Sequence, residues 1–376
     1  MDTIQIVHCA DIHFDSSFSI MQSRVALRRE EQKESFRRVI KQIQQNNSDL
    51  LLLAGDLFES QLATKETIIF LKNCFEAIPQ TYIFISPGNH DPASPGSFYL
   101  TETWPSNVHI FKGAPEMIEL PKKNVRVYGA GFTSTFSRTP LLINPLIVDT
   151  SYINILLIHG DIAASNSSYN SITPDIIEAS KMDYVALGHI HNFSGILKAG
   201  NTFYAYCGTP EGRGFDETGD KGIISGNISK SLCELKFVPT CIRKYITIEI
   251  DISNCSTIDD VVQRIVESCL DETNLYLYKV ILKGSIDSNF RIKPSLLLTK
   301  LKSKYFYIKI IDYTVTKVNL EILRKETSLK GIFTSNMLTK IAFAENKSDT
   351  AGAQLLTEAL NIGLRAFEGE VLPDED

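Results

Sequence analysis

Apolar strands that end abruptly in polar, metal-binding side chains constrain this chain more than any other feature. The stretch ISPGNHDP, residues 85–92, continues a β-rich apolar run, 82–85, into Asn89, His90 and Asp91 within one turn. Polar side chains beside a core are costly unless they are paired or bind something. The stretch therefore predicts a buried strand whose end opens into a binding site.

The same arrangement recurs at the ends of other predicted strands. Polar motifs follow the strands 3–10, 50–54, 153–158 and 184–187, in turn Asp11-Ile12-His13, Gly55-Asp56, His159-Gly160-Asp161 and Gly188-His189-Ile190-His191. Strand ends of one α/β sheet meet at one edge, where such folds place ligands. In an extended segment, Asp-x-His and His-x-His direct alternate side chains to the same side. We expect these side chains to converge on one centre.

The residue types at this centre indicate metal chemistry. Carboxylates, one amide and imidazoles without a thiolate suit borderline divalent ions such as Mn²⁺, Fe²⁺ or Zn²⁺. Seven candidate ligands are too many for one ion but enough for two that share a carboxylate: Asp11, His13, Asp56, Asn89, His159, His189 and His191. Two such ions clamp a phosphoester and activate water. The sequence therefore predicts a dinuclear phosphoester-cleaving site.

The pattern of predicted strands and helices changes near residue 240, and a length of 376 residues favours more than one domain. Residues 1–240 alternate buried strands with helices. In residues 241–317 the sequence pattern predicts a strand, a helix, a strand, a helix and a strand in this order. Ser256 and Asp259 are predicted to cap the first helix, and Pro294 to begin the second. Residues 318–376 are predicted to be helical. We expect a main domain, a smaller α+β domain and a helical C-terminal segment.

Two further surfaces have two interpretations each. Residues 283–330 contain eleven Lys and Arg residues but only four acidic ones. Aromatic residues are interleaved with the basic ones, which include Lys293, Lys300, Lys302 and Lys304. This segment is a phosphate-binding surface or an ordinary solvated face. The apolar stripe of Leu356, Leu360, Leu364 and Phe367 has helical spacing. It docks a partner or belongs to the chain's own core.

Composition limits the class of protein. The net charge is −6, which as a bulk figure does not favour a nucleic-acid partner. The seven cysteines are scattered without a C-x-x-C spacing and are interpreted as reduced thiols. No apolar run approaches the ~18 to 20 residues of a membrane helix, and the start lacks the basic residues of a signal peptide. We expect a cytoplasmic protein that does not contact membranes.

The motifs D-x-H, G-D, G-N-H-D, H-G and G-H-x-H, in this order, resemble the calcineurin-like metallophosphoesterases. Within that family, HCADIHFDSSF, DLLLLAGDLFES and DYVALGHIHN look like the SbcD-type DNA repair exonucleases, and YCGTPEGRGFDETGDKG is similar to their YhaO branch. The resemblance covers residues 1–230 and continues more weakly beyond. It implies an α/β fold, a two-sheet β-sandwich flanked by helices, with residues 241–317 as a DNA-binding capping domain.

The resemblance also implies a role for each site residue. Asp11, His13, Asp56 and His191 would hold one ion, and Asp56, Asn89, His159 and His189 the other. His90 would contact the scissile phosphate and protonate the leaving oxygen, while Asp91 steadies its ring. Glu59 departs from the pattern, because related nucleases carry a histidine there.

Three functions follow as hypotheses. The first is a two-metal DNA nuclease that works with an SbcC-type coiled-coil ATPase bound to residues 318–376, and a homodimer is left open. The second is a phosphodiesterase or phosphatase for small substrates that uses the same metals. The third is a non-catalytic scaffold, although no ligand is missing from the motifs.

Overall fold

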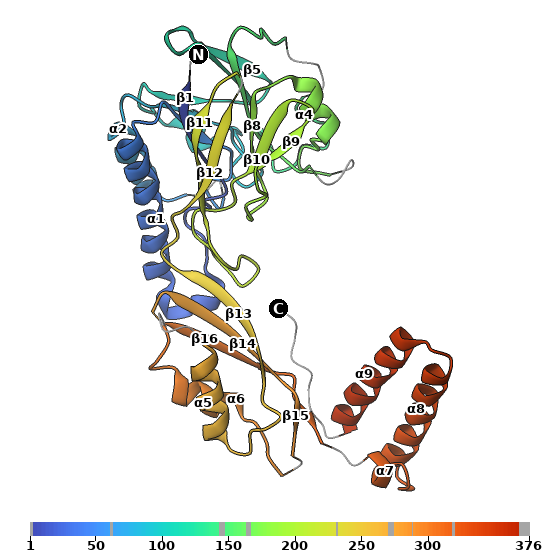
Figure 1. Cartoon of the computed structure of the whole chain (residues 1–376). Coiled ribbons are helices and arrows are strands. Elements are labelled where there is room, and N and C mark those ends of the chain that lie inside the picture. Colours follow the sequence, from blue (N-terminus) through green and yellow to red (C-terminus); the bar gives the residue numbers. More distant parts are fainter. Residues whose placement is uncertain are drawn as a thin grey trace. The chain divides into compact units, whose positions relative to one another are not determined.

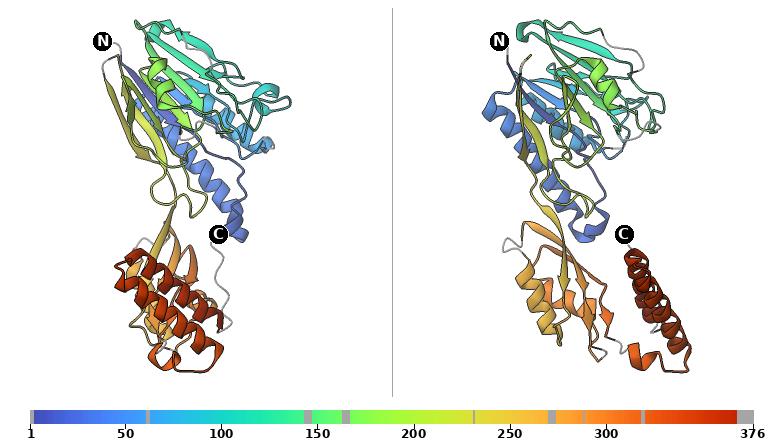
Figure 2. Two further views of the ribbon diagram at one scale, coloured as in Figure 1. Left: turned by 90° about the vertical axis from the view of Figure 1, so that its right-hand side faces the viewer. Right: turned by 45° about the vertical axis from the view of Figure 1, so that its right-hand side comes forward.

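The computed structural model describes residues 3–60, 63–142, 147–162, 167–230, 232–269, 274–287, 289–317 and 320–367 (Figures 1 and 2). The chain divides into two compact units, residues 1–244 and 245–376. The predicted boundary between 317 and 318 touches residues outside the described ranges.

The first unit contains two six-stranded sheets among its described residues. One has the order β12-β11-β1-β2-β3-β4 and the other β5-β6-β7-β8-β10-β9. The strands of the first are β1 (Ile4–Cys9), β2 (Leu50–Leu53), β3 (Tyr82–Ile85), β4 (Val108–Ile110), β11 (Gly222–Ile228) and β12 (Cys233–Pro239). Those of the second are β5 (Glu116–Leu120), β6 (Val125–Ala130), β7 (Ile153–His159), β8 (Tyr184–Gly188), β9 (Leu197–Ala199) and β10 (Thr202–Tyr206).

The two sheets pack face to face, with helices on both outer faces (Figures 1 and 2). Alternate residues of β1 and β2 join the inter-sheet core, while their neighbours pack under α1 (Val25–Asn46) and α2 (Lys65–Glu76). On the far side, α4 (Pro174–Ser180) covers the second sheet. The shorter helices are η1 (Ser19–Arg24), α3 (Phe98–Thr101) and η2 (Pro121–Lys123). The predicted helix-flanked two-sheet sandwich is confirmed.

The parallel strands place the polar motifs. β1, β2, β3 and β4 run parallel in one sheet, and β6, β7, β8 and β10 run parallel in the other. The motif-bearing loops follow β1, β2 and β3 on one side and β7 and β8 on the other. The expectation that one sheet supplies all of them is wrong, because the centre is assembled from the strand ends of both sheets.

The second unit begins with the predicted order of strands and helices. It contains β13 (Lys244–Asp251), α5 (Ile258–Ser268), β14 (Tyr276–Lys283), α6 (Pro294–Leu301) and β16 (Tyr307–Asp312), followed by α7 (Leu320–Leu323), α8 (Leu329–Asn346) and α9 (Thr350–Phe367). A short pair, β15 (Ser285–Ile286) and β17 (Val315–Thr316), was not predicted separately. The cap of α5 is Thr257 with Asp260, one residue later than predicted.

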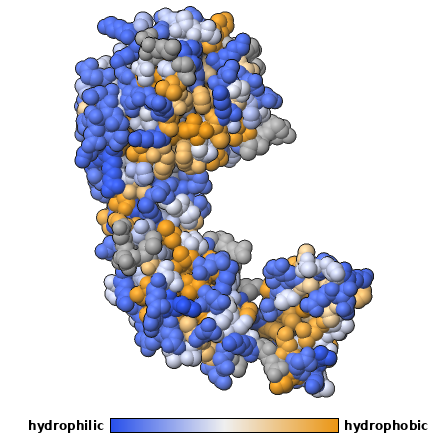
Figure 3. Space-filling view, in the orientation of Figure 1, coloured by the Kyte–Doolittle hydropathy of each residue, from blue (hydrophilic) through white to orange (hydrophobic). Residues whose placement is uncertain are grey.

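The apolar stripe of α9 packs mainly within the second unit. Leu360 and Leu364 are 2% and 7% exposed and form a cluster with Leu323 and Met337. The two central leucines of the stripe therefore belong to the chain's own core, while docking of a partner on the rest of the stripe stays a prediction. Apolar residues do show on the visible face of the helices α7 to α9 (Figure 3). Among the described residues, none of the helices combines the length and hydrophobicity that crossing a membrane requires.

Candidate metal centre

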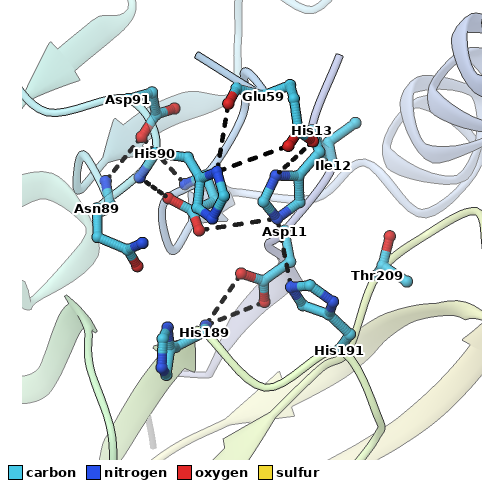
Figure 4. Close-up of polar contacts among 12 residues, drawn as sticks. Asp11, Ile12, His13, Glu59, Asn89, His90, Asp91, His189, His191 and Thr209 are labelled. Carbon is cyan, nitrogen blue, oxygen red and sulfur yellow. Dashed lines mark hydrogen bonds and ion pairs between the residues drawn. The ribbon is translucent and has the colours of Figure 1, made fainter. Parts of the chain in front are cut away.

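The loops after five strands bring the predicted ligands together (Figure 4). Carboxylate oxygens and imidazole nitrogens of Asp11, His13 and His191 lie within 4.8 Å of one another. The same holds for Asp11, Asp56 and His159. His13 and Asp56 form a third such group with His90. The side chains of Asp11, His13, Asp56 and His159 are completely or almost completely buried.

The backbone at this centre is strained. Asp11, His13 and Asp56 have φ angles of 52°, 52° and 51°, and His189 has a φ of 114°. Such conformations cost non-glycine residues about 1–3 kcal/mol each and cluster at functional sites. Gly88 is required for close approach, because a Cβ there would lie 2.2 Å from the Asp56 Oδ1 atom. The fold therefore stores strain to hold these side chains in place.

In the first group, ring nitrogens of two histidines direct their lone pairs toward each other. His191 Nδ1 lies 2.7 Å from Glu217 Oε1 and 3.0 Å from Arg213 Nη2, and His13 Nδ1 lies 3.2 Å from the Glu59 carboxylate. Because a carboxylate oxygen is the nearest partner of each Nδ1, we assign the protons to these Nδ1 atoms. Protons on both Nδ1 atoms leave both Nε2 atoms as acceptors. These Nε2 atoms lie 3.3 Å apart, and His13 Nε2 is 3.7 Å from Asp56 Oδ2. Acceptors that converge in this way need a cation between them.

A second group has the same character. His159 Nδ1–H donates to the Ala54 carbonyl at 2.8 Å, so its Nε2 is an acceptor. That Nε2 faces the Asn89 amide oxygen at 3.0 Å and Asp56 Oδ2 at 3.4 Å. Asp56 therefore contacts both groups and is the residue placed to bridge two ions. The donor set of imidazoles, carboxylates and one amide oxygen fits borderline divalent cations.

His189 is placed beside the second group. Its ring centroid lies 5.2 Å from that of His159, and its backbone N–H donates to both carboxylate oxygens of Asp11 at 3.0 and 3.1 Å. Its imidazole does not belong to the groups that converge within 4.8 Å among the described residues. Its predicted role as a ligand therefore stays a prediction.

The electrostatics favour a bound cation. Burial lowers the pKa of His13 to about 4 and that of His189 to about 4, which keeps both imidazoles in the neutral, metal-binding form. Burial and then the charge of Asp56 raise the pKa of Asp11. Burial also acts to raise the pKa of Asp56, but nearby imidazoles, His159 first, outweigh it and lower the pKa. A cation between these two carboxylates would let both stay ionised.

Three supporting residues were not predicted. Arg213 donates to Glu59 at 2.8 Å and to Glu217 at 2.9 Å, and Glu217 is almost fully buried. Despite burial, hydrogen bonds from His13 and His191 and the Arg213 charge lower the pKa of Glu59 and of Glu217 to about 2. Ionised partners of this kind orient metal-binding histidines.

His90 and Asp91 have different surroundings. The His90 side chain is 41% exposed, and its Nδ1 lies 3.2 Å from the Glu59 carbonyl oxygen, which leaves Nε2 for a substrate. Asp91 accepts hydrogen bonds from Tyr99 and from four backbone amides, those of Asp56, Leu57, Phe58 and Gly88. The expectation that Asp91 steadies the His90 ring is wrong, because Asp91 instead joins the loops that carry Asp56 and Asn89.

The chain is similar to known proteins. It is 31% identical over 243 residues to the uncharacterized metallophosphoesterase YhaO of Bacillus subtilis (strain 168), a match that covers 60% of this chain and 59% of YhaO. A crystal structure of TT1561 of Thermus thermophilus aligns at 10% identity and a TM-score of 0.38 over 63% of this chain and 99% of that one. A score of this size carries no argument about function.

The family model described as calcineurin-like phosphoesterase matches residues 4–193, half of the chain. That region contains all seven predicted ligands and the strands that position them. The order of the motifs, the two-sheet fold and the converging acceptors agree with this match. The chain therefore belongs to the calcineurin-like phosphoesterase family, whose members are metal-dependent phosphoester hydrolases.

Proposed function

We propose that the chain is a two-metal phosphodiesterase that cuts DNA. The observation that supports this most is the position of Asp56 Oδ2, which lies 3.7 Å from His13 Nε2 and 3.4 Å from His159 Nε2, beside an exposed imidazole, His90. Phosphodiester cleavage needs charge stabilisation on both sides of the phosphorus and a proton for the leaving oxygen. The candidate centre provides residues for both needs.

When bound, two divalent ions supply a nucleophilic hydroxide from water and neutralise the phosphate. Asp11, His13 and His191 would hold one ion, and Asn89 and His159 would hold the other, with Asp56 between them. His90 would donate a proton from Nε2 to the leaving oxygen as the bond from phosphorus to that oxygen breaks. Its own backbone N–H donates to Asp56 at 2.9 Å, which ties its position to the bridging carboxylate.

DNA as the substrate rests on the second unit and on the resemblance to SbcD-type nucleases. Lys293, Lys300, Lys302 and Lys304 are exposed, as a surface that binds phosphates requires. Lys300 lies 2.8 Å from Asp259, so it contributes less positive charge than the other three. An SbcC-type ATPase partner and a homodimer are proposed from the resemblance alone.

A small-substrate diesterase or phosphatase is the second candidate. It is favoured by a cavity of about 490 Å³ beside His90, a size that suits a single nucleotide. The two candidates share the metal centre and differ in what lies beyond the phosphate. The identity of the metals, with Mn²⁺ favoured, is part of the same proposal.

Three substrates compared in Mn²⁺ test the proposal. Purified protein receives end-labelled DNA, the p-nitrophenyl ester of thymidine 5′-phosphate, and p-nitrophenyl phosphate, each with and without EDTA. A DNA nuclease cuts the DNA and the diester, and EDTA abolishes both reactions. Hydrolysis of the diester without DNA cleavage would favour the small-substrate enzyme. If protein loaded with two metals catalyses none of the three reactions, the result would favour the non-catalytic scaffold.

A further inference from the structure

The cavity beside the metal centre has an unusual lining. It is bounded by Asn89 and His90 of the candidate centre, by Glu59, Ser60 and Thr135, and by two aromatic rings, Phe136 and Tyr169. Phe136 is 55% exposed, and its ring centroid lies 5.8 Å from that of Tyr169 at an interplanar angle of 32°. An exposed phenylalanine at the mouth of a reaction centre is a surface available for stacking.

The aromatic pair continues a series of rings that starts at the metal centre. The ring of His159 lies 5.2 Å from that of His189, which lies 5.1 Å from that of Tyr169. Phe136 is the outermost ring of this series. A flat group that stacks on Phe136 or Tyr169 would therefore lie next to a phosphate held at the metals.

Backbone hydrogen bonds hold the two aromatic loops together. The Ser137 amide donates to the Ser168 carbonyl at 2.8 Å, and the Asn170 amide donates to the Ser137 carbonyl at 2.9 Å. The side chain of Asn170 is buried and donates to the His159 carbonyl at 2.7 Å. This links the loop that carries Tyr169 to the strand that carries a metal ligand. The rings are thus positioned by the same framework as the metal centre.

The charge of the lining selects among flat groups. Among the seven lining residues, Glu59 carries the only permanent charge, and it is negative. Glu59 is paired with Arg213 at 2.8 Å, so the lining offers a second phosphate no Lys or Arg, whereas a neutral ring needs no opposite charge. The volume of about 490 Å³ accommodates one nucleoside. The chemistry of the cavity therefore fits a neutral aromatic base attached to the phosphate.

We propose that Phe136 and Tyr169 form a stacking platform for the nucleobase that adjoins the scissile phosphate. The inference deepens the proposed function and rests on it for the position of the phosphate. It makes nucleoside-bearing phosphodiesters the substrate class and gives an end base of DNA, or the base of a free nucleotide, the same site. Stacking of a base on aromatic side chains contributes roughly 1–3 kcal/mol, about 5- to 150-fold in affinity.

Two competing inhibitors measure the platform. Deoxyadenosine 5′-phosphate and 2-deoxyribose 5-phosphate carry the same phosphate to the Mn²⁺-loaded protein, and only the first carries a base. We expect the nucleotide to bind about 5- to 150-fold more tightly, by calorimetry and by inhibition of diester hydrolysis. Phe136→Leu should remove much of this preference and Phe136→Trp should keep it. Phe343→Leu, a matched change at a 62% exposed phenylalanine of α8, should not alter it.

The outcomes separate this inference from the proposed function. An active phosphodiesterase in which Phe136→Leu leaves the nucleotide preference unchanged overturns the platform alone. A protein that prefers the nucleotide through Phe136 but cuts no DNA overturns the DNA substrate and keeps the platform. Equal binding of both phosphates by the unaltered protein also overturns the platform. DNA with an abasic end, cut as fast as DNA with a normal end, would contradict its use on strand ends.

Discussion

Replacing Glu217 by Gln tests how the centre is held together. Glu217 Oε1 accepts from His191 Nδ1 at 2.7 Å and from Arg213 at 2.9 and 3.2 Å, and Oε2 accepts from the Arg213 amide at 2.7 Å. Gln keeps one acceptor oxygen but turns the other into an amino group. If that oxygen serves His191, the amino group must face the Arg213 amide, and two donors then oppose each other.

The magnitude follows from this geometry. Loss of an outer partner of a metal-binding histidine lowers metal affinity by about 10- to 100-fold, or roughly 1.4–2.7 kcal/mol. Because Glu217 is almost fully buried and accepts from four N–H donors, we expect the upper half of that range. The effect should fall on one ion only, since His191 belongs to the group with Asp11 and His13 and not to the group around His159.

Calorimetric titration of the metal-depleted protein with Mn²⁺ measures both sites. We expect Glu217→Gln to weaken one binding step and leave the other close to that of the unaltered protein. Glu234→Gln makes the same chemical change at an exposed residue of β12 and serves as the control. Two unaltered binding steps in Glu217→Gln would refute the view that this carboxylate orients His191.

Three further changes test other parts of the account. His90→Asn should keep close to two metals per chain while cleavage falls by roughly 10² to 10⁴, whereas Asp56→Ala should lose both metal binding and cleavage. Equal metal loss in the two variants, measured by elemental analysis, would contradict the assignment of His90 as a proton donor and Asp56 as a metal ligand. Neutral replacements should flatten the salt dependence of DNA binding by roughly 0.7 to 0.9 log units for each lysine–phosphate interaction removed, if they are made at Lys293, Lys300, Lys302 and Lys304. The contribution of Lys300 should be smaller, and hydrolysis of the small diester should not change. An unchanged slope of DNA affinity against salt concentration would make this segment an ordinary solvated face. Burial lowers the pKa of His8 to about 3, so as pH falls below about 6.5 the unfolded chain gains a proton that the folded chain does not, and folding stability is lost. The stability of the protein relative to His8→Gln should therefore drop by about 2 kcal/mol from pH 7 to pH 5 in urea unfolding. A constant difference would show that the pKa of His8 is the same in the folded and the unfolded chain.

The sequence predicted that several of the candidate ligands lie together because their pattern is local. Each motif directly follows an apolar strand, so its place depended only on where that strand ended and on the parallel direction of its neighbours. Asp11, Asp56 and His159 therefore converge as expected. The strands β11 and β12 were not predicted, because no polar motif marks their ends.

Other features depend on contacts that no local pattern records. Asp91 follows His90 directly in the chain, yet its carboxylate turns to backbone amides of two loops and to Tyr99. Glu217 reaches His191 across 26 residues, through a loop with no regular spacing. The stripe of α9 predicted an apolar face correctly, but which partner covers it was decided by packing with α7 and α8. In each case the partner of the side chain is determined by tertiary contacts.

Anomalous diffraction from crystals grown with Mn²⁺ would show directly whether Asp56 bridges two metal ions. We expect two anomalous peaks per chain, about 3.5–4 Å apart, with Asp56 in contact with both. Asp11, His13 and His191 should surround one peak, and Asn89 and His159 the other. A single peak, or two peaks of which only one contacts Asp56, would show that the centre is not a dinuclear site bridged by this carboxylate.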